Sequence, residues 1–229
     1  MTYSPFESIN PQPGDSNVVM DIELSNRCNA QCHFCPRSAL PSLGHMTQET
    51  FTTCIQRVKE AGIKTISFAG RGESMQNPRF ADFVQQAHKE DLHAIVVTNG
   101  SHFNSHNTTN FHKWGIKQVT ISMSDFGEAY EQVYKLPFKQ TMDKIRKFIK
   151  YNAKRMDIVI VIVDHGNNSP PIRQQQEYWT SLGVNSIIHN KITRAGSASY
   201  GDNIYFDRSK KSSEEIMDII LSSDTPPVC

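Results

Sequence analysis

Three of the chain's five cysteines lie within eight residues, at Cys28, Cys32 and Cys35. Residues 18–24, just before them, form an apolar and β-branched run that predicts a strand, so the cysteines are expected on the loop at its C-terminal end. Three thiolates on one short loop can bind one metal centre, and soft sulfur ligands select zinc, copper(I) or an iron–sulfur cluster. Three cysteines can hold three irons of a four-iron cluster and leave the fourth open for a substrate or cofactor.

Other interpretations of this loop stay open at this point. Zinc sites normally show a second ligand pair at a distance, and the sequence has no second pair of closely spaced cysteines. His33 or His45 could complete a zinc site, and the loop could instead carry ordinary reduced thiols.

The spacing Cys-x3-Cys-x2-Cys, with aromatic Phe34 before the last cysteine, resembles the signature of the radical S-adenosylmethionine (radical SAM) superfamily. The resemblance covers about residues 18–196 and is to the barrel part of the SPASM/twitch-type subfamily. It implies that Cys28, Cys32 and Cys35 hold a [4Fe-4S] cluster whose open iron chelates S-adenosylmethionine. It also implies that Phe34 packs near the adenine of that cofactor.

A glycine-containing loop follows the next predicted strand, residues 63–68. Gly70 and Gly72 allow the backbone to approach a ligand closely, at the same end of the sheet as the cysteines. Gly70, Gly72 and Glu73 resemble the superfamily's Gly-x-Gly-Glu-Pro motif, which contacts the amino group of S-adenosylmethionine. Ser74 stands where the family usually has proline, a departure that removes no ligand.

Polar residues also end the third and fourth predicted strands, residues 93–98 and 118–124. The radical SAM resemblance implies further cofactor contacts at these ends and in the segment that follows, at Thr98, Asn99, Ser122, Ser124 and Lys135. Lys135 stands where relatives often have arginine, and it supplies charge without a bidentate fork. The alternatives are a simple turn after the third strand and ordinary capping of the fourth.

Candidate substrate contacts follow the last two predicted strands, residues 157–163 and 184–189. Asp164 and His165 come directly after the first of these strands. Arg194 follows the second and could bind an anionic group, and it also stands among the predicted cofactor contacts.

The strands alternate with amphipathic helices six times, at roughly one βα unit per thirty residues. This pattern predicts a parallel α/β sheet, and six units are fewer than the eight of a closed barrel. The resemblance implies an open, partial (β/α)6 TIM-like barrel with its chemistry at the C-terminal strand ends. The expected helices span residues 47–61, 79–90, 141–152, 173–182 and 213–221.

Three regions are expected along the chain. Residues 1–17 are rich in proline, serine and asparagine and predict an irregular arm, and residues 18–196 form the partial barrel. Residues 197–229 would contain a C-terminal helix and the start of an auxiliary-cluster extension, because relatives of that subfamily carry further cysteine ligands soon after the barrel. Cys229 would then belong to an auxiliary cluster in a longer form, and the alternative is an incidental surface cysteine.

Composition narrows the function classes. The formal net charge is +1, which gives no electrostatic footprint for nucleic acid or an anionic membrane, and RNA modification gains no support from it. No apolar run is long enough to span a bilayer, and the N-terminus lacks a signal pattern. We therefore predict a cytoplasmic protein with no nucleic-acid or membrane partner, in which clustered cysteines favour a metal over a disulfide.

The resemblance implies an enzyme. Its reduced [4Fe-4S] cluster would cleave S-adenosylmethionine to methionine and a 5′-deoxyadenosyl radical, which abstracts hydrogen from a peptide or small metabolite. Flavodoxin or ferredoxin would donate the electron. The alternatives are a non-enzymatic iron–sulfur protein for electron transfer or redox sensing and a zinc-stabilised α/β binding module.

Overall fold

The structure is a computed structural model that describes residues 18–191, with side chains described through residue 188. The predicted arm at 1–17 and the predicted segment at 197–229 lie outside the described residues. Arg194 and Cys229 lie outside them as well.

Six parallel strands form one sheet in the order β1-β2-β3-β4-β5-β6, so neighbours in sequence are neighbours in space. The strands are β1 (Val19–Asp21), β2 (Thr65–Phe68), β3 (His93–Thr98), β4 (Ile116–Ser122), β5 (Asp157–Asp164) and β6 (Ser186–Lys191). Every pairing is parallel, and the described sheet ends at β1 and β6, which do not pair with each other. The predicted open, partial TIM-like α/β barrel is confirmed.

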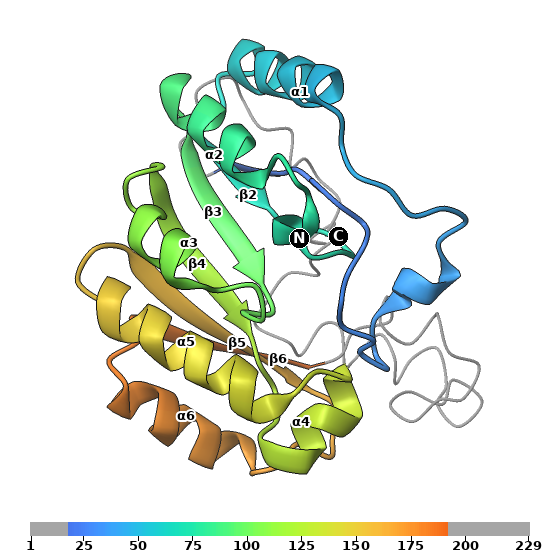
Figure 1. Ribbon diagram of the computed structural model, residues 1–229, viewed down its shortest axis with the longest axis vertical. Coiled ribbons are helices and arrows are strands. Elements are labelled where there is room, and N and C mark those ends of the chain that lie inside the picture. Colours follow the sequence, from blue (N-terminus) through green and yellow to red (C-terminus); the bar gives the residue numbers. More distant parts are fainter. Residues whose placement is uncertain (1–17, 192–229) are drawn as a thin grey trace, which may run out of the picture.

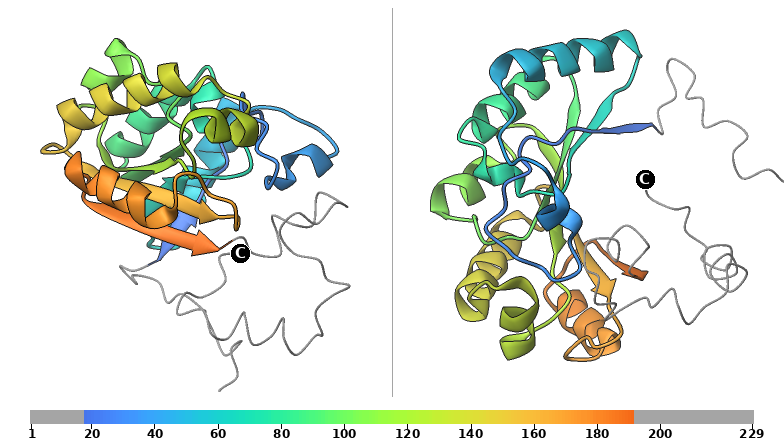
Figure 2. Two further views of the ribbon diagram at one scale, coloured as in Figure 1. Left: turned by 90° about the horizontal axis from the view of Figure 1, so that it is seen from below. Right: turned by 90° about the vertical axis from the view of Figure 1, so that its right-hand side faces the viewer.

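Helices connect the strands and gather on one side of the sheet (Figure 1; Figure 2, left). They are α1 (Gln48–Glu60), α2 (Phe80–Lys89), α3 (Ser105–Asn110), α4 (Gly127–Tyr134), α5 (Phe138–Asn152) and α6 (Ile172–Ser181). Because all strands run the same way, their C-terminal ends share one edge of the sheet, where the loops of the site meet.

Local sequence explains the clearest elements. β5 is an unbroken β-branched run, the composition of a parallel strand covered on both faces, and Ile158, Ile160 and Ile162 are buried. At the start of α1, the Thr47 side chain accepts a hydrogen bond from the Thr50 amide and so caps the helix as predicted.

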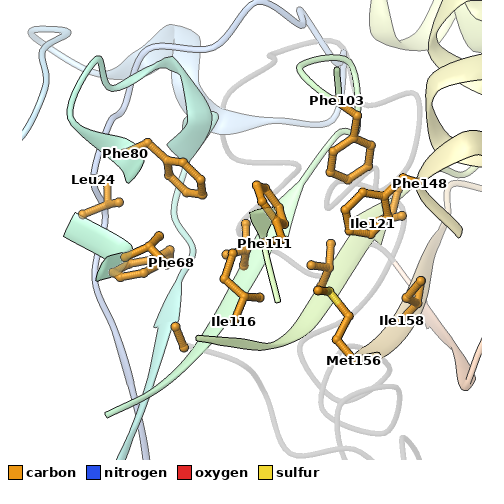
Figure 3. Close-up of a cluster of buried hydrophobic side chains, with 14 of the residues drawn as sticks. Leu24, Phe68, Phe80, Phe103, Phe111, Ile116, Ile121, Phe148, Met156 and Ile158 are labelled. Atoms are coloured by element: carbon orange, nitrogen blue, oxygen red, sulfur yellow. The ribbon is translucent and has the colours of Figure 1, made fainter. Parts of the chain in front are cut away.

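An aromatic core lies between the sheet and the helices (Figure 3). The rings of Phe103 and Phe148 stack with centroids 4.0 Å apart, and those of Phe51 and Phe83 stack at 4.3 Å. All four side chains are buried, so they fix the helices against the sheet and thereby the positions of the strand ends.

The first strand is shorter than predicted, because Leu24 bonds to residues outside β2. β1 ends at Asp21, whereas the prediction extended it to Leu24. The Leu24 carbonyl accepts from the Met46 amide at 2.9 Å and from Asn77 Nδ2 at 2.8 Å. These bonds turn the chain toward the cysteines before a longer ladder can form.

Two helices have too short an apolar stripe to stand out in the sequence and were not predicted. α3 has a capping box between Asn104 and Asn107, and α4 ends in a left-handed Lys135. No helix in residues 18–191 is long and apolar enough to cross a membrane.

Candidate functional site

The three clustered cysteines lie on the loop that leaves β1 for α1. We call residues 28–40 the cysteine loop; its only helical element is a 3-10 turn at Pro36–Ala39. Cys28, Cys32 and Cys35 are half-buried and form no disulfide. The Ala30 amide donates to Cys28 Sγ at 3.4 Å, and Cys35 Sγ donates to the Arg71 carbonyl at 3.8 Å.

The electrostatics of the thiols suit a metal centre. Burial raises the pKa of the Cys28 and Cys32 thiols, and the neighbouring sulfurs raise it further, because thiolates close together repel one another. Without a cation the two thiols therefore stay protonated at neutral pH. Binding iron would remove these protons, since the metal ligand is the thiolate. Three soft donors that interact with one another fit an iron–sulfur cluster.

Glu73 is a buried carboxylate without a basic partner among the described residues. It is 2 % exposed and accepts hydrogen bonds from Thr98 Oγ1 at 3.0 Å, from the Asn99 amide at 2.9 Å and from the Met75 amide at 3.2 Å. Burial raises its pKa to about 6, although these donors favour the charged form. The site therefore holds a desolvated negative charge that an ammonium group would complement.

Close packing surrounds both glycines before Glu73, and at Gly72 the neighbouring atoms are backbone. A Cβ at Gly72 would lie 2.0 Å from the Ser25 carbonyl oxygen and 2.6 Å from that of Arg27. The Glu73 amide donates to the same Arg27 carbonyl at 2.8 Å. At Gly70 a Cβ would meet the Glu23 side chain at 2.3 Å. The loop after β2 thus rests directly on the chain that leads into the cysteine loop.

Asn99 joins the third motif to the other two. Its amide binds Glu73, and its side-chain Nδ2 approaches Cys28 Sγ at 3.8 Å and Asn29 Oδ1 at 3.1 Å. Thr98 and Asn99 are both buried. We call Gly72, Glu73, Thr98 and Asn99 the carboxylate cradle. The structure places this cradle against the cysteine loop, as the order of the motifs predicts.

The remaining predicted cofactor contacts are less closely grouped. Phe34 packs edge-on against Tyr134, with ring centroids 5.9 Å apart. Ser122 ends β4 and is half-buried, and Lys135 is exposed after α4. Arg194 lies outside the described residues.

Ser124 has different surroundings from the other predicted cofactor contacts. It is completely buried, and its Oγ accepts from the Tyr134 hydroxyl at 2.8 Å and from the Val163 amide at 2.8 Å. Its amide donates to the same Tyr134 oxygen at 3.0 Å. Ser124 therefore connects β4, β5 and α4, and its contact with the cofactor stays a prediction.

The two predicted substrate contacts after β5 differ in their surroundings. Asp164 is half-buried, and its Oδ1 accepts from the Gly166 amide at 2.9 Å. His165 is buried, and its Nε2 lies 2.7 Å from Asp125 Oδ2. In this structure protein side chains therefore cover the His165 ring.

Sequence reasoning did not identify Tyr134 as a neighbour of the cysteine loop, and it placed Asp125 only at a strand end that faces the site. Tyr134 lies in a short helix, and its carbonyl accepts from the Gln31 amide at 2.9 Å. Asp125 follows β4 at the C-terminal edge of the sheet, where functional residues gather. That position in the sequence indicates a residue near the site.

Within residues 18–191, no group of three His, Cys, Asp or Glu side chains is arranged to hold one metal ion. This finding concerns a single ion. In a four-iron cluster each thiolate binds its own iron, so the sulfurs stand further apart.

Comparison with protein families gives a direct match. Residues 22–170 match the family model described as the radical SAM superfamily, which is more than half of the chain. The chain belongs to the radical SAM superfamily. Its members are enzymes that use a [4Fe-4S] cluster and S-adenosylmethionine, and the cysteine loop and carboxylate cradle fit these two cofactors. No curated protein sequence matches the chain significantly.

Solved structures share the fold at low sequence identity. The chain is similar to Streptococcus suis SuiB bound to precursor peptide SuiA, with a TM-score of 0.68 and 12% identity over 90% of this chain and 46% of that one. It is also similar to anSMEcpe with bound AdoMet, with a TM-score of 0.64 and 19% identity over 76% and 51% of the two chains. For methylornithine synthase (PylB) the TM-score is 0.61 and the identity 14%, over 76% and 53%. The chain thus spans about half the length of these proteins.

Proposed function

We propose that Cys28, Cys32 and Cys35 hold the [4Fe-4S] cluster and that the carboxylate cradle holds S-adenosylmethionine beside it. The observation that carries this proposal is the contact between the two regions, in which Asn99 approaches both Cys28 and Glu73. When bound, the cluster supplies the electron that cleaves S-adenosylmethionine to methionine and a 5′-deoxyadenosyl radical. That radical would take hydrogen from a substrate.

In this proposal Glu73 binds the amino group of S-adenosylmethionine. Its neighbours are neutral donors, so the carboxylate can accept a charge-assisted hydrogen bond from an ammonium group. Thr98 and the Asn99 amide hold the carboxylate in place. Gly72 lets the loop that carries Glu73 lie directly against the backbone of Ser25 and Arg27, which brings the carboxylate beside the cysteine loop.

Three further residues keep the roles that their positions support. Phe34 would flank the adenine, because it lies on the cysteine loop between two of the proposed ligands. Ser122 would approach the cofactor from the end of β4, and Lys135 would attract its carboxylate from the end of α4. Arg194 remains a predicted contact for an anionic group.

A peptide or a small metabolite is the proposed substrate, and flavodoxin or ferredoxin the proposed electron donor. The fold shared with SuiB, whose structure holds a precursor peptide, supports a peptide. The proposed compartment is the cytoplasm, where thiols stay reduced and available to iron.

The test is anaerobic reconstitution with iron and sulfide, then addition of dithionite and S-adenosylmethionine, with 5′-deoxyadenosine measured by chromatography. We expect deoxyadenosine from the wild type and none above background from Cys32→Ala. Cys54→Ala is the matched control, because Cys54 is also half-buried but lies on α1, outside the cysteine loop. It should behave as the wild type.

A stable cluster that binds no S-adenosylmethionine and yields no deoxyadenosine would contradict the proposal. That outcome would favour the electron-transfer or redox-sensing protein. A colourless protein that binds zinc in place of iron would favour the zinc-stabilised module.

A further inference from the structure

A buried ionisable pair lies at the ends of β4 and β5, beside the cysteine loop. The side chains of His165 and Asp125 are 2 % and 0 % exposed, and His165 Nε2 lies 2.7 Å from Asp125 Oδ2. Because a carboxylate only accepts hydrogen bonds, Nε2 carries the hydrogen of this bond. Removing a carboxylate from water is costly, so such a pair persists only where the surrounding structure supports it.

The surroundings hold the pair rigidly. Asp125 Oδ1 accepts from the Ser169 amide at 2.9 Å. The His165 amide donates to Asn168 Oδ1 at 3.2 Å, and Asn168 Nδ2 donates to the carbonyls of Ser124 and Val163 at 2.8 and 2.9 Å. These bonds fasten the loop after β5 to the end of β4, so the imidazole has one orientation.

The imidazole of His165 packs against the cysteine loop. Its ring lies nearly parallel to that of Phe34, with an interplanar angle of 22° and centroids 6.2 Å apart. It also meets the edge of His33 at 5.6 Å. Phe34 also packs edge-on against Tyr134, whose hydroxyl donates to Ser124 Oγ. Phe34 is therefore held by two side chains that are both anchored at residues 124 and 125.

The contact between Phe34 and His165 joins segments that follow strands far apart in the sheet. The cysteine loop leaves β1, at one end of the strand order, whereas Asp125 and His165 follow β4 and β5. Neither the β1–β2 pairing nor α1 brings the loop to those strands. The aromatic contacts at Phe34, together with the bond from the Gln31 amide to the Tyr134 carbonyl, make the connection.

We propose that Asp125 and His165 are positioning residues for the cysteine loop: through Phe34 they hold the segment between Cys32 and Cys35 over the ends of β4 and β5. The positioning role itself does not depend on the proposed function. Its expected effect on S-adenosylmethionine binding does, because that effect assumes that Phe34 flanks the cofactor. Loss of the pair should loosen this segment and weaken S-adenosylmethionine binding, while all three cysteine ligands remain.

The first test is amide hydrogen exchange of the metal-free protein, which does not depend on the proposed function. Two amides report on the loop: Gln31, bonded to the Tyr134 carbonyl, and Cys35, bonded to the Cys32 carbonyl. In His165→Ala these amides should exchange about tenfold faster, because the packing that keeps them closed is lost. Asp125→Asn keeps the side-chain shape and should give a smaller increase in the same direction.

Asn152→Ala is the matched control. Asn152 is buried and donates to the carbonyls of Thr108 and Phe148, at the end of α5 away from the cysteine loop. Its loss should lower overall stability and leave exchange at Gln31 and Cys35 unchanged. If His165→Ala and Asp125→Asn both leave these two amides at the wild-type rate, and only the loop after β5 exchanges faster, the inference is wrong.

The second test uses the cluster-loaded protein. In His165→Ala the KM for S-adenosylmethionine should rise about tenfold with iron content unchanged, and the electron paramagnetic resonance signal of the reduced cluster should need correspondingly more S-adenosylmethionine to shift. An unchanged KM and an unchanged titration would overturn the stated consequence. A wild type that makes no deoxyadenosine would contradict the proposed function, whereas the exchange result would still decide the role of the pair.

Discussion

The carboxylate cradle and the cysteine loop meet in one site but are built in different ways. The cradle sits at the ends of two neighbouring, regularly paired strands, and its side chains are buried and hydrogen-bonded to each other. The cysteine loop is largely irregular, and its thiols are half-buried. Its contacts come from the loops after β3 and β5 and from α4. The fold alone thus completes the cradle, whereas the cysteine loop still needs its metal to replace the thiol protons.

Gly72→Ala should have the largest effect, because it acts where the two regions touch. The new Cβ would lie 2.0 Å from the Ser25 carbonyl oxygen, and backbone on both sides cannot move away. We expect the free energy of unfolding to fall by about 3 kcal/mol, as for overpacked cores, and S-adenosylmethionine binding to be lost. Chemical denaturation measures the first effect. Gly44→Ala, where a Cβ meets nothing within 4 Å, is the control and should show neither change.

Glu73→Gln should weaken the function of the carboxylate cradle and leave that of the cysteine loop intact. The amide keeps the shape of the side chain but cannot pair with an ammonium group, and a hydrogen bond to a charged group contributes about 1.5–3 kcal/mol. The KM for S-adenosylmethionine should therefore rise about 10- to 150-fold. Iron and sulfide content should stay at the wild-type level. Loss of the cluster in this variant would show that the cradle also supports the cysteine loop.

The cradle should also set a pH dependence of stability in the metal-free protein. Burial raises the pKa of Glu73 from 4.5 to about 6, so the folded state binds the proton more tightly than the unfolded state. The resulting stabilisation is fully present below pH 4.5 and is lost as the pH rises through 6. The loss amounts to about 2 kcal/mol. Denaturation of wild type and Glu73→Gln across this range should show the difference, and parallel curves would contradict it.

Cluster assembly should depend on pH in the opposite sense. Since burial raises the pKa of Cys28 and Cys32, the thiolate fraction grows with pH across the neutral range. The initial rate of reconstitution should rise up to about tenfold per pH unit for each thiolate that limits it. Absorbance of the forming cluster between pH 7 and 8 measures this rate. A rate independent of pH would mean that deprotonation does not limit assembly.

Sequence alone predicted a parallel sheet of six βα units and located the cysteine and glycine motifs, because these depend on short-range patterns. Runs such as residues 157–163 and 93–98 have the composition of buried strands, and the structure places strands there. The cysteine spacing and the glycines before Glu73 are likewise local. What failed depended on contacts across the fold.

Two examples show why such contacts are not visible in the sequence. The end of β1 depends on Asn77, whose Nδ2 donates to the carbonyls of Leu24 and Met46. The Ser124 hydroxyl accepts a hydrogen bond from the Tyr134 hydroxyl, a partner on α4 that the sequence did not indicate. Neither partner belongs to a repeating pattern, so periodicity could not predict them.

The contact between Phe34 and His165 also bears on the order of events during synthesis. The two rings are about 130 residues apart in the chain, and a ribosome adding about 5–20 residues per second needs roughly 7–26 s to cover that distance. The clustered thiols are made first, and His165, which contacts their loop, is added only after β5. Throughout this interval the nascent chain displays three unprotected cysteines, so we expect iron insertion to follow release of the barrel from the ribosome.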